Sequence, residues 1–251
     1  MGMKIMFHMM NEARLDVGFQ GFILASAAYL YALNYARERL QGKDLDKIRD
    51  PDASQVPIIQ HPDVRRMLLW MKSHVEGMRS FVYYVRTCFD KLAVASNEDE
   101  KTHYDCLIQL LTPVVKAYCS ERGFEVCDLA IQVYGGYGYT KEYPVEQLLR
   151  DCRIASIYEG TNGIQAMDLL GRKLGMKKGM VFMSFLGEIQ KVIALAKDSP
   201  GLESLSTKVE VATNRLGEVA LHLGKAVMSP DLKVAFVYAH PFLESMGDVT
   251  M

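Results

Sequence analysis

The sequence carries almost no net charge, and this excludes several kinds of partner. It contains 29 lysine and arginine residues against 30 aspartate and glutamate residues, for a formal net charge of −1. Proteins that bind nucleic acid or an anionic membrane through charge usually show a strong local excess of positive residues. The composition therefore predicts neither nucleic acid nor an anionic membrane surface as a partner.

Cysteine motifs and long apolar runs are also missing. The five cysteines are scattered with no CxxC pair, at Cys88, Cys106, Cys119, Cys127 and Cys152. No zinc-ligand spacing is present, and a dispersed odd set is typical of reduced cysteines in a cytoplasmic protein. No apolar run follows a basic start, and the apolar stretch 21–28 is far too short to cross a membrane. We expect a cytoplasmic protein with no signal peptide and no membrane span.

Both ends of the sequence look cut. The chain starts inside an apolar segment, residues 3–10, and it stops at residues 241–251 without a clear helix cap. We expect a portion of a longer protein.

Helical periodicity dominates what is present. No proline occurs from Asn11 to Arg39, and apolar residues recur there at helical spacing. We predict a long helix that Asn11 caps and Gly42 ends. Residues 42–56 are polar and are predicted to form a loop. Pro62 then opens a second helix that runs to about Ala95.

The rest of the chain is also predicted to be helical. A capping-box pattern opens a third helix at Asn97, Pro113 restarts or kinks it, and a fourth segment runs to the glycines after Val133. Short helices follow Pro144 and cover about 163–174, and further helices cover roughly 180–197, 201–228 and 231–240. No segment shows strand alternation. We predict an all-α fold: an up-down helical bundle over 1–175, then a smaller helical appendage over 176–251 that joins it near Lys177.

The first loop of unusual composition contains three glycines among aromatic residues, at Gly135, Gly136 and Gly138. Glycines at a helix end permit positive φ and close approach of the backbone. They indicate either a backbone surface for a flat or phosphorylated ligand, or a helix cap and packed turn, which the spacing alone favours. No strand precedes them, so a dinucleotide-binding fold is not indicated.

The second loop places Glu159 between Tyr158 and Gly160, and Thr161 can cap the helix that follows. A carboxylate in apolar surroundings can act as a general base, and the helix end offers free backbone N–H groups. The alternative is an ordinary solvated loop glutamate, which composition alone favours.

Together the two loops resemble the C-terminal signature of the acyl-CoA dehydrogenases. The matching positions keep the family's order and spacing: Gln132, Gly135, Gly136, Gly138 and Tyr139, then 143–146, then 150–151, then 157–161. The resemblance covers residues 3–175, while 176–251 look like the helical tail of one bacterial-type branch. It implies the family's C-terminal four-helix-bundle domain. The family's N-terminal helical domain and middle β-domain are absent from this sequence.

The resemblance implies the α,β-dehydrogenation of an acyl-CoA to a trans-2-enoyl-CoA. In the family a base removes the α-proton, and the β-hydride passes to N5 of FAD. Glu159 matches that base. Some relatives place the base on the first helix of this domain, but here that position is Ala13, which favours Glu159 and leaves Glu12 as a minor alternative.

Further site residues follow from the same resemblance. Arg39 matches the arginine that reaches the FAD pyrophosphate of a neighbouring subunit, and Gln132, Gly135 and Gly136 match the loop along the adenosine end of that FAD. Thr161 matches a flavin contact within its own subunit.

On the substrate side, Asn11 and Arg14 match positions lining the CoA channel, Tyr158 flanks the thioester, and Gly160 is assigned to the substrate site with it. One position departs from the family pattern: Gly163 stands where a glutamine often binds FAD, which puts that hydrogen bond in doubt.

The resemblance also implies partners. These are an acyl-CoA substrate, an electron-transfer flavoprotein or similar acceptor, and further copies of the chain, since family FAD sites straddle subunits. We expect a homodimer or homotetramer, and a chain that alone binds FAD weakly and turns over little. Two alternatives stay open: a dehydrogenase-like flavoprotein without this activity, such as the DNA-alkylation-response branch, and a non-catalytic helical oligomerisation domain.

Overall fold

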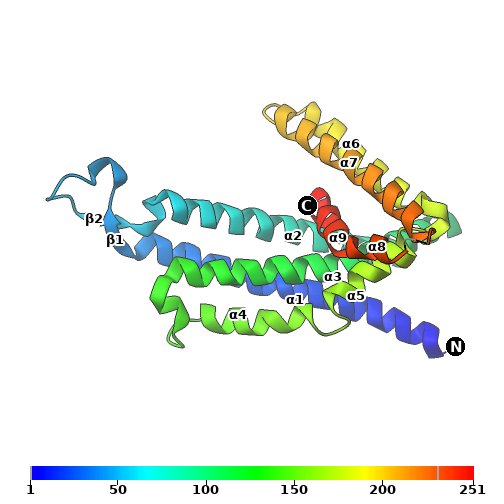
Figure 1. The fold of residues 1–251 in the computed structure, drawn as a ribbon, viewed down its shortest axis with the longest axis horizontal. Helices are drawn as coiled ribbons and strands as arrows, with labels where there is room; N and C mark the ends of the chain where they lie inside the picture. Colours follow the sequence, from blue (N-terminus) through cyan, green and yellow to red (C-terminus); the bar gives the residue numbers. More distant parts are fainter. Residues whose placement is uncertain (1, 231) are drawn as a thin grey trace. The chain divides into compact units, whose positions relative to one another are not determined.

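The described residues are almost all helical, as predicted. The computed structural model describes residues 2–230 and 232–251. Three long helices come first, and shorter ones follow the glycines (Figure 1). Their bounds are α1 Gly2–Glu38, α2 Pro62–Val94, α3 Glu98–Tyr134, α4 Val145–Arg153, α5 Asn162–Asp168, α6 Met180–Lys197, α7 Glu203–Val227, α8 Leu232–Val237 and α9 Ala239–Thr250.

The first helix and the segment after it differ from the prediction. Asn11 is no cap, because α1 already begins at Gly2, and α1 ends at Glu38 rather than at Gly42. The expected loop contains a small antiparallel ribbon, β1 Leu40–Lys43 and β2 Gln55–Pro57. Its strands are too short to show alternation, and the positive φ of Gly42, 72°, accompanies an irregular register.

The third helix is also longer than predicted. Asn97 caps it as expected, since its Oδ1 accepts from the backbone N–H of Glu100 at 2.9 Å. However, α3 continues through Pro113 and includes the predicted fourth segment. A proline inside a helix costs about 3 kcal/mol. Here the turns on either side are anchored in the core, where Leu111 and Val114 are fully buried.

The chain forms two compact units, which we call unit 1 and unit 2. Unit 1 comprises Met1–Asp16, Ser80–Tyr118 and Ile157–Met251, and unit 2 comprises Val17–Arg79 and Cys119–Ser156. The three long helices therefore contribute residues to both units, and each unit is described by itself below.

In unit 2, α1 and α3 are in backbone contact. A Cβ added to Gly21 would lie 2.6 Å from the carbonyl oxygen of Cys119, and one added to Gly123 would lie 2.6 Å from that of Gly21. The buried face of α1 continues with alanines that are fully buried, at Ala25, Ala28, Ala32 and Ala36. Small residues at helical spacing thus allow the close approach of the two helices.

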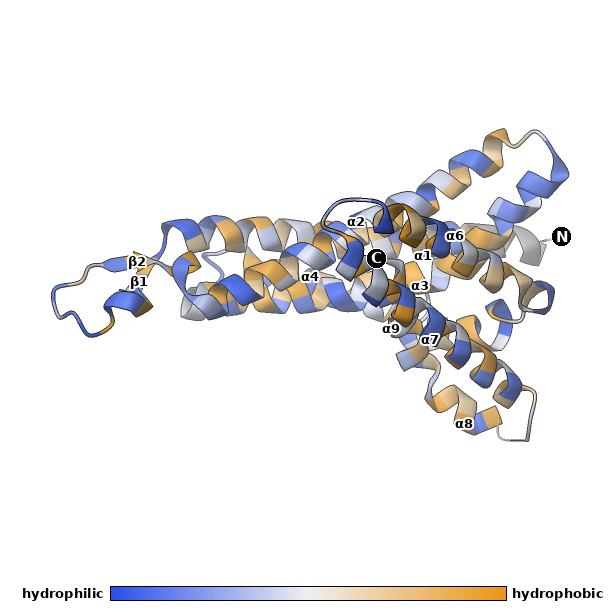
Figure 2. Cartoon of the chain, turned by 90° about the horizontal axis from the view of Figure 1, so that it is seen from above, coloured by the Kyte–Doolittle hydropathy of each residue, from blue (hydrophilic) through white to orange (hydrophobic). Residues whose placement is uncertain are grey.

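In unit 1, the C-terminal helices pack on each other and on α3. The connection into α6 contains two consecutive lysines with left-handed backbone, Lys177 and Lys178, and then Gly179. Polar and apolar residues alternate along α7 in Figure 2, the pattern of a helix with one packed side. Near the end of the chain, the hydroxyl of Tyr118 donates to Oδ1 of Asp248 at 2.6 Å and ties α9 to α3.

By length and composition alone, two stretches are apolar enough to cross a membrane, Met9–Glu38 and Met176–Lys197. Both take part in packing within the protein: Ala25 and Ala28 of the first and Phe182 and Phe185 of the second are buried.

Candidate active site

The Glu159 loop has an unusual backbone. Glu159 has a φ of 55° and Gly160 a φ of 86°, both in the left-handed region. For a residue with a side chain this conformation costs on the order of 1–3 kcal/mol and occurs most often at functional sites. Thr161 then caps α5 as predicted, since its Oγ1 accepts from the backbone N–H of Ile164 at 3.4 Å. The loop is therefore held in one shape at the start of a helix.

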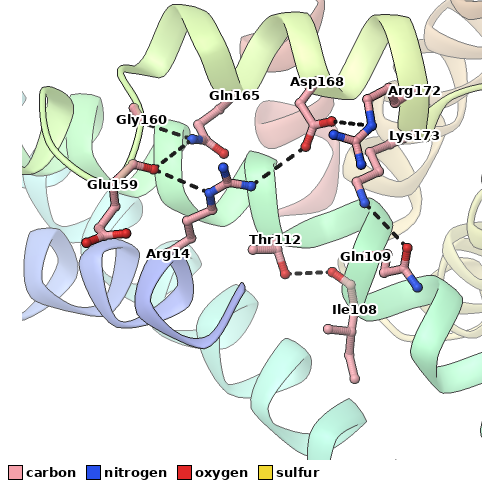
Figure 3. A network of polar contacts seen from close by, with 10 residues as sticks. All are labelled: Arg14, Ile108, Gln109, Thr112, Glu159, Gly160, Gln165, Asp168, Arg172 and Lys173. Carbon is pink, nitrogen blue, oxygen red and sulfur yellow. Dashed lines mark hydrogen bonds and ion pairs between the residues drawn. The ribbon is translucent and has the colours of Figure 1, made fainter. Parts of the chain in front are cut away.

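Glu159 is half-buried, and no described residue forms an ion pair with its carboxylate. Arg14, the nearby arginine of α1, donates from Nε to the backbone carbonyl of Glu159 at 3.3 Å instead. Figure 3 shows the carboxylate pointing away from the network that holds its backbone. Within residues 2–230 and 232–251, no hydrogen bond or ion pair involves this carboxylate. It is thus available to a ligand.

The Arg14 guanidinium is itself held by an acidic partner. Its NH1 lies 3.8 Å from Oδ2 of Asp168, and both side chains are only 12% exposed. Asp168 also faces Arg172, whose Nε lies 3.3 Å from its Oδ1. The single carboxylate of Asp168 therefore lies between two arginines, in a partly buried network of unit 1 (Figure 3).

Gln165 of α5 was not singled out by the sequence, yet it contacts the loop directly. Its Nε2 donates to the backbone carbonyls of Glu159 at 3.2 Å and Gly160 at 3.3 Å. A fully buried amide is unusual and needs partners. A glutamine on the packed side of a short helix, four residues after the capping threonine, was the signal that could have pointed to it.

Two buried lysines support the same region. Lys116 of α3 is fully buried and donates from Nζ to Oδ1 of Asn162 at 2.7 Å. Lys173 donates to Oε1 of Gln109 at 3.4 Å. Burial lowers the pKa of Lys173, an effect that the nearby carboxylate of Asp168 opposes.

The other predicted substrate residues also belong to unit 1. Asn11 is half-buried and lies three residues before Arg14, on the same side of α1. Tyr158 is exposed beside Glu159, and Gly160 is half-buried. Unit 1 therefore contains Asn11, Arg14, Tyr158, Glu159 and Gly160, together with Thr161.

The remaining predicted cofactor residues lie together in unit 2. Arg39 is half-buried directly after α1, and its guanidinium carbon lies 5.2 Å from the centre of the Tyr137 ring. That contact occupies one face of the guanidinium, and its N–H groups have no hydrogen-bond partner among the described residues. Gln132 is exposed on the last turns of α3.

The glycine loop combines both interpretations of its sequence. A Cβ on Gly138 would lie 2.7 Å from the carbonyl oxygen of Ile131, so this glycine serves a packed turn. Gly135 has a φ of 63°, and a Cβ on Gly135 or Gly136 would meet nothing within 4 Å. These two glycines thus expose an open stretch of backbone.

Tyrosines fill the space behind this loop. The rings of Tyr35 and Tyr134 stack with centres 4.0 Å apart, and those of Tyr137 and Tyr143 stack at 5.3 Å. Burial raises the pKa of both Tyr35 and Tyr134. The cluster fixes the ring of Tyr137, over which Arg39 lies.

Comparison with known protein families identifies the family of this chain. The profile described as the C-terminal domain of acyl-CoA dehydrogenase matches residues 1–175. The chain belongs to the acyl-CoA dehydrogenase family. A second profile, described as acetyl-CoA dehydrogenase C-terminal like, matches residues 185–251.

Two curated relatives are named as dehydrogenases, and a third is a subunit of a reductase complex. A butyryl-CoA dehydrogenase of Syntrophomonas wolfei is 43% identical over 78% of this chain and 32% of its own length. The 3-methylmercaptopropionyl-CoA dehydrogenase of Ruegeria pomeroyi is 39% identical over 99% of this chain and 42% of its own length. Subunit CarC of the caffeyl-CoA reductase–Etf complex of Acetobacterium woodii is 34% identical over 66% of this chain and 37% of its own. The chain thus spans well under half the length of these relatives.

Solved structures share the fold. Caenorhabditis elegans ACDH-11 in complex with C11-CoA superposes with a TM-score of 0.78 at 18% identity, over 96% of this chain and 39% of that one. An acyl-CoA dehydrogenase from Bacillus anthracis complexed with FAD gives a TM-score of 0.74 at 22% identity, over 98% and 42%. The helical fold from α1 to α9 is therefore shared with these solved structures.

Proposed function

We propose that this chain supplies the catalytic base and part of the FAD site of an acyl-CoA dehydrogenase that converts an acyl-CoA to a trans-2-enoyl-CoA. The observation that carries the proposal is the half-buried Glu159 in a loop of strained backbone, whose carboxylate has no hydrogen-bond or ion-pair partner among the residues that the structure describes. Because the chain spans only part of its relatives, the activity is proposed for a protein that also contains their remaining length.

Glu159 is the group that takes the α-proton. The α-proton of a thioester is weakly acidic, so the base must be ionised, oriented and shielded from bulk water. An arginine paired with the carboxylate would hold it in the wrong place and weaken it as a base. Here Arg14 is occupied by the Glu159 carbonyl and by Asp168. Glu12, the alternative base, is exposed on α1 and has no comparable support.

Residues of unit 2 fit one part of FAD. The N–H groups of Arg39 suit a diphosphate, which is anionic and accepts several hydrogen bonds. Gly135 and Gly136 let a ligand approach the backbone closely. We therefore assign Arg39, Gln132, Gly135 and Gly136 to the cofactor, and Thr161 to a separate flavin contact in unit 1. The bound FAD supplies the acceptor for the β-hydride.

The proposed partners follow from the comparisons and the resemblance. Acyl-CoA is the substrate, in keeping with the names of the relatives and with the C11-CoA bound to ACDH-11. The electron acceptor is an electron-transfer flavoprotein or a similar protein, a proposal supported by the relative whose name places it in a complex with Etf. Asn11, Arg14, Tyr158 and Gly160 are assigned to the substrate side, in a homodimer or homotetramer.

The decisive experiment replaces the base in the complete protein. Glu159→Gln keeps the size of the side chain and removes its basicity, so anaerobic acyl-CoA should no longer bleach the flavin absorbance. Glu12→Gln is the matched control and should bleach at the wild-type rate. Bleaching that survives in Glu159→Gln would overturn the role of Glu159. The base would then lie elsewhere in the complete protein, and this chain would be a non-catalytic helical oligomerisation domain or use another of its residues.

A further inference from the structure

We infer that Gln165 positions the catalytic base: its amide holds the Glu159–Gly160 backbone in the left-handed shape that directs the carboxylate to the substrate. The inference rests on the proposed role of Glu159 and adds to it a residue that does not touch the substrate. Proton transfer depends steeply on the placement of the base, and a displacement of about 1 Å can cost roughly 100-fold in rate.

The amide of Gln165 makes an unusual pair of contacts. Both of its hydrogen bonds go to consecutive backbone carbonyls, those of Glu159 at 3.2 Å and Gly160 at 3.3 Å. Two adjacent carbonyls can point at one donor only when the intervening backbone is bent sharply, as the φ values of 55° and 86° require. The amide NH₂ group can therefore bind both carbonyls in this bent conformation of the loop, but not in an extended conformation.

The orientation of the amide is fixed by its surroundings. Turned over, the amide would bring its own oxygen against two carbonyl oxygens, which is repulsive. In the observed orientation Oε1 is buried and has no hydrogen-bond partner within the described part of the chain. A buried acceptor without a partner costs on the order of 1–3 kcal/mol. The protein therefore accepts an unsatisfied oxygen in order to present the NH₂ group to the loop.

Gly160 leaves room for this contact. A Cβ at Gly160 would lie 2.8 Å from Nε2 of Gln165 and would displace the amide. The glycine after the base is thus required twice, for its φ of 86° and for the approach of Gln165. This second requirement is specific to the glutamine and is not explained by the turn alone.

A second side chain, that of Arg14, also donates to the carbonyl of Glu159. Arg14 reaches the carbonyl of Glu159 from α1, and Asp168 orients Arg14 from α5. Gln165 and Asp168 lie three residues apart on α5, on one side of the helix (Figure 3). One short helix therefore supports both donors to the carbonyl of the base.

The test measures proton abstraction in the complete, FAD-loaded protein. Gln165→Met keeps the length of the side chain and removes its donors. We expect single-turnover flavin bleaching to slow about 10- to 100-fold, with the dissociation constant for acyl-CoA changed by less than about threefold. Because α-proton removal becomes slower, the kinetic isotope effect with α-deuterated acyl-CoA should rise. A purely structural role would change the amount of active protein but not the isotope effect.

Controls separate this inference from the proposed function. Gln190→Met makes the same change at a half-buried glutamine of α6 that takes no part in the network beneath the Glu159 loop, and it should leave the bleaching rate and isotope effect unchanged. Gln165→Asn withdraws the amide by one methylene and should also slow bleaching, which provides the test if Gln165→Met does not fold. Wild-type rates and isotope effect in the folded Gln165 variants would overturn the inference alone, whereas bleaching by Glu159→Gln would overturn the role of the base itself.

Discussion

At the scale of single residues, unit 1 buries several charged groups beneath the Glu159 loop, and each is linked to a polar partner. Lys116 binds Asn162, Lys173 binds Gln109, and Asp168 lies between two arginines. Buried charges are tolerated only when they are paired or hydrogen-bonded. These paired charges hold the region in a defined conformation, although burying them costs free energy. A rigid support of this kind suits a loop that must keep one conformation.

Lys173 gives a pH-dependent prediction. Burial lowers its pKa in the folded state, so the unfolded chain binds that proton more tightly. The free energy of unfolding should rise as the pH increases from the lowered pKa of Lys173 toward the ordinary lysine value of about 10.4. Lys173→Met should reduce this rise in chemical denaturation across that pH range. The control Lys191→Met, at an exposed lysine of α6, should retain it; equal profiles for both variants would contradict the prediction.

Arg39 gives a prediction about the cofactor. Arg39→Ala removes the charged donors proposed to bind the FAD diphosphate, and charge-assisted hydrogen bonds contribute about 1.5–3 kcal/mol. In the complete protein, FAD affinity should therefore fall roughly 10- to 100-fold, visible as low FAD per polypeptide after purification. Arg37→Ala, at an exposed arginine two residues earlier, is the matched control and should keep its FAD. Full FAD occupancy in Arg39→Ala would contradict the assignment of Arg39 to the FAD diphosphate.

At the scale of elements, the contact between α1 and α3 in unit 2 depends on glycine. Gly21→Ala places a methyl group against the backbone of Cys119, with no flexible side chain able to yield. Overpacking of this kind costs about 1–3 kcal/mol in the free energy of unfolding. Denaturant unfolding should show that loss.

The matched control for this contact is Gly224→Ala on α7, where a Cβ meets nothing within 4 Å. Alanine is the better helix former, so this variant should gain about 0.5–1 kcal/mol. If both alanine variants changed stability alike, helix propensity rather than the helix contact would govern Gly21.

At the scale of the whole molecule, the proposed functions divide between the two units. The proposed base and substrate residues belong to unit 1. The proposed cofactor residues Arg39, Gln132, Gly135 and Gly136 belong to unit 2. The long helices α1, α2 and α3 supply residues to both. We propose that each group is one part of a larger site, in keeping with a chain that spans 32–42% of the length of two curated relatives.

This division predicts how the chain behaves by itself. Mixed with FAD, it should bind weakly and without a sharp stoichiometric end point in a fluorescence titration, because it presents one part of the cofactor site. Light scattering should give a dimer or a larger assembly. Tight one-to-one binding would show that the chain holds a self-sufficient cofactor site, and a monomer would contradict the proposed homo-oligomer.

The sequence by itself determined that the chain is helical, and it drew attention to the loop that contains Glu159 and its capping threonine, Thr161. Helical periodicity, the Asn97 and Thr161 caps and the glycines act over a few residues, so they can be recognised locally. The order and spacing of the two loops pointed to the family, which the profile match confirmed.

Only the tertiary structure decided the rest. It showed that α3 continues through Pro113, because burial on both sides outweighs a local preference to break. It also directed Arg14 to the carbonyl of Glu159 rather than to its carboxylate, and it brought the amide of Gln165 to the same carbonyl. Such contacts join residues 6 to 145 positions apart, and no local pattern specifies which atom of a side chain or backbone will face which.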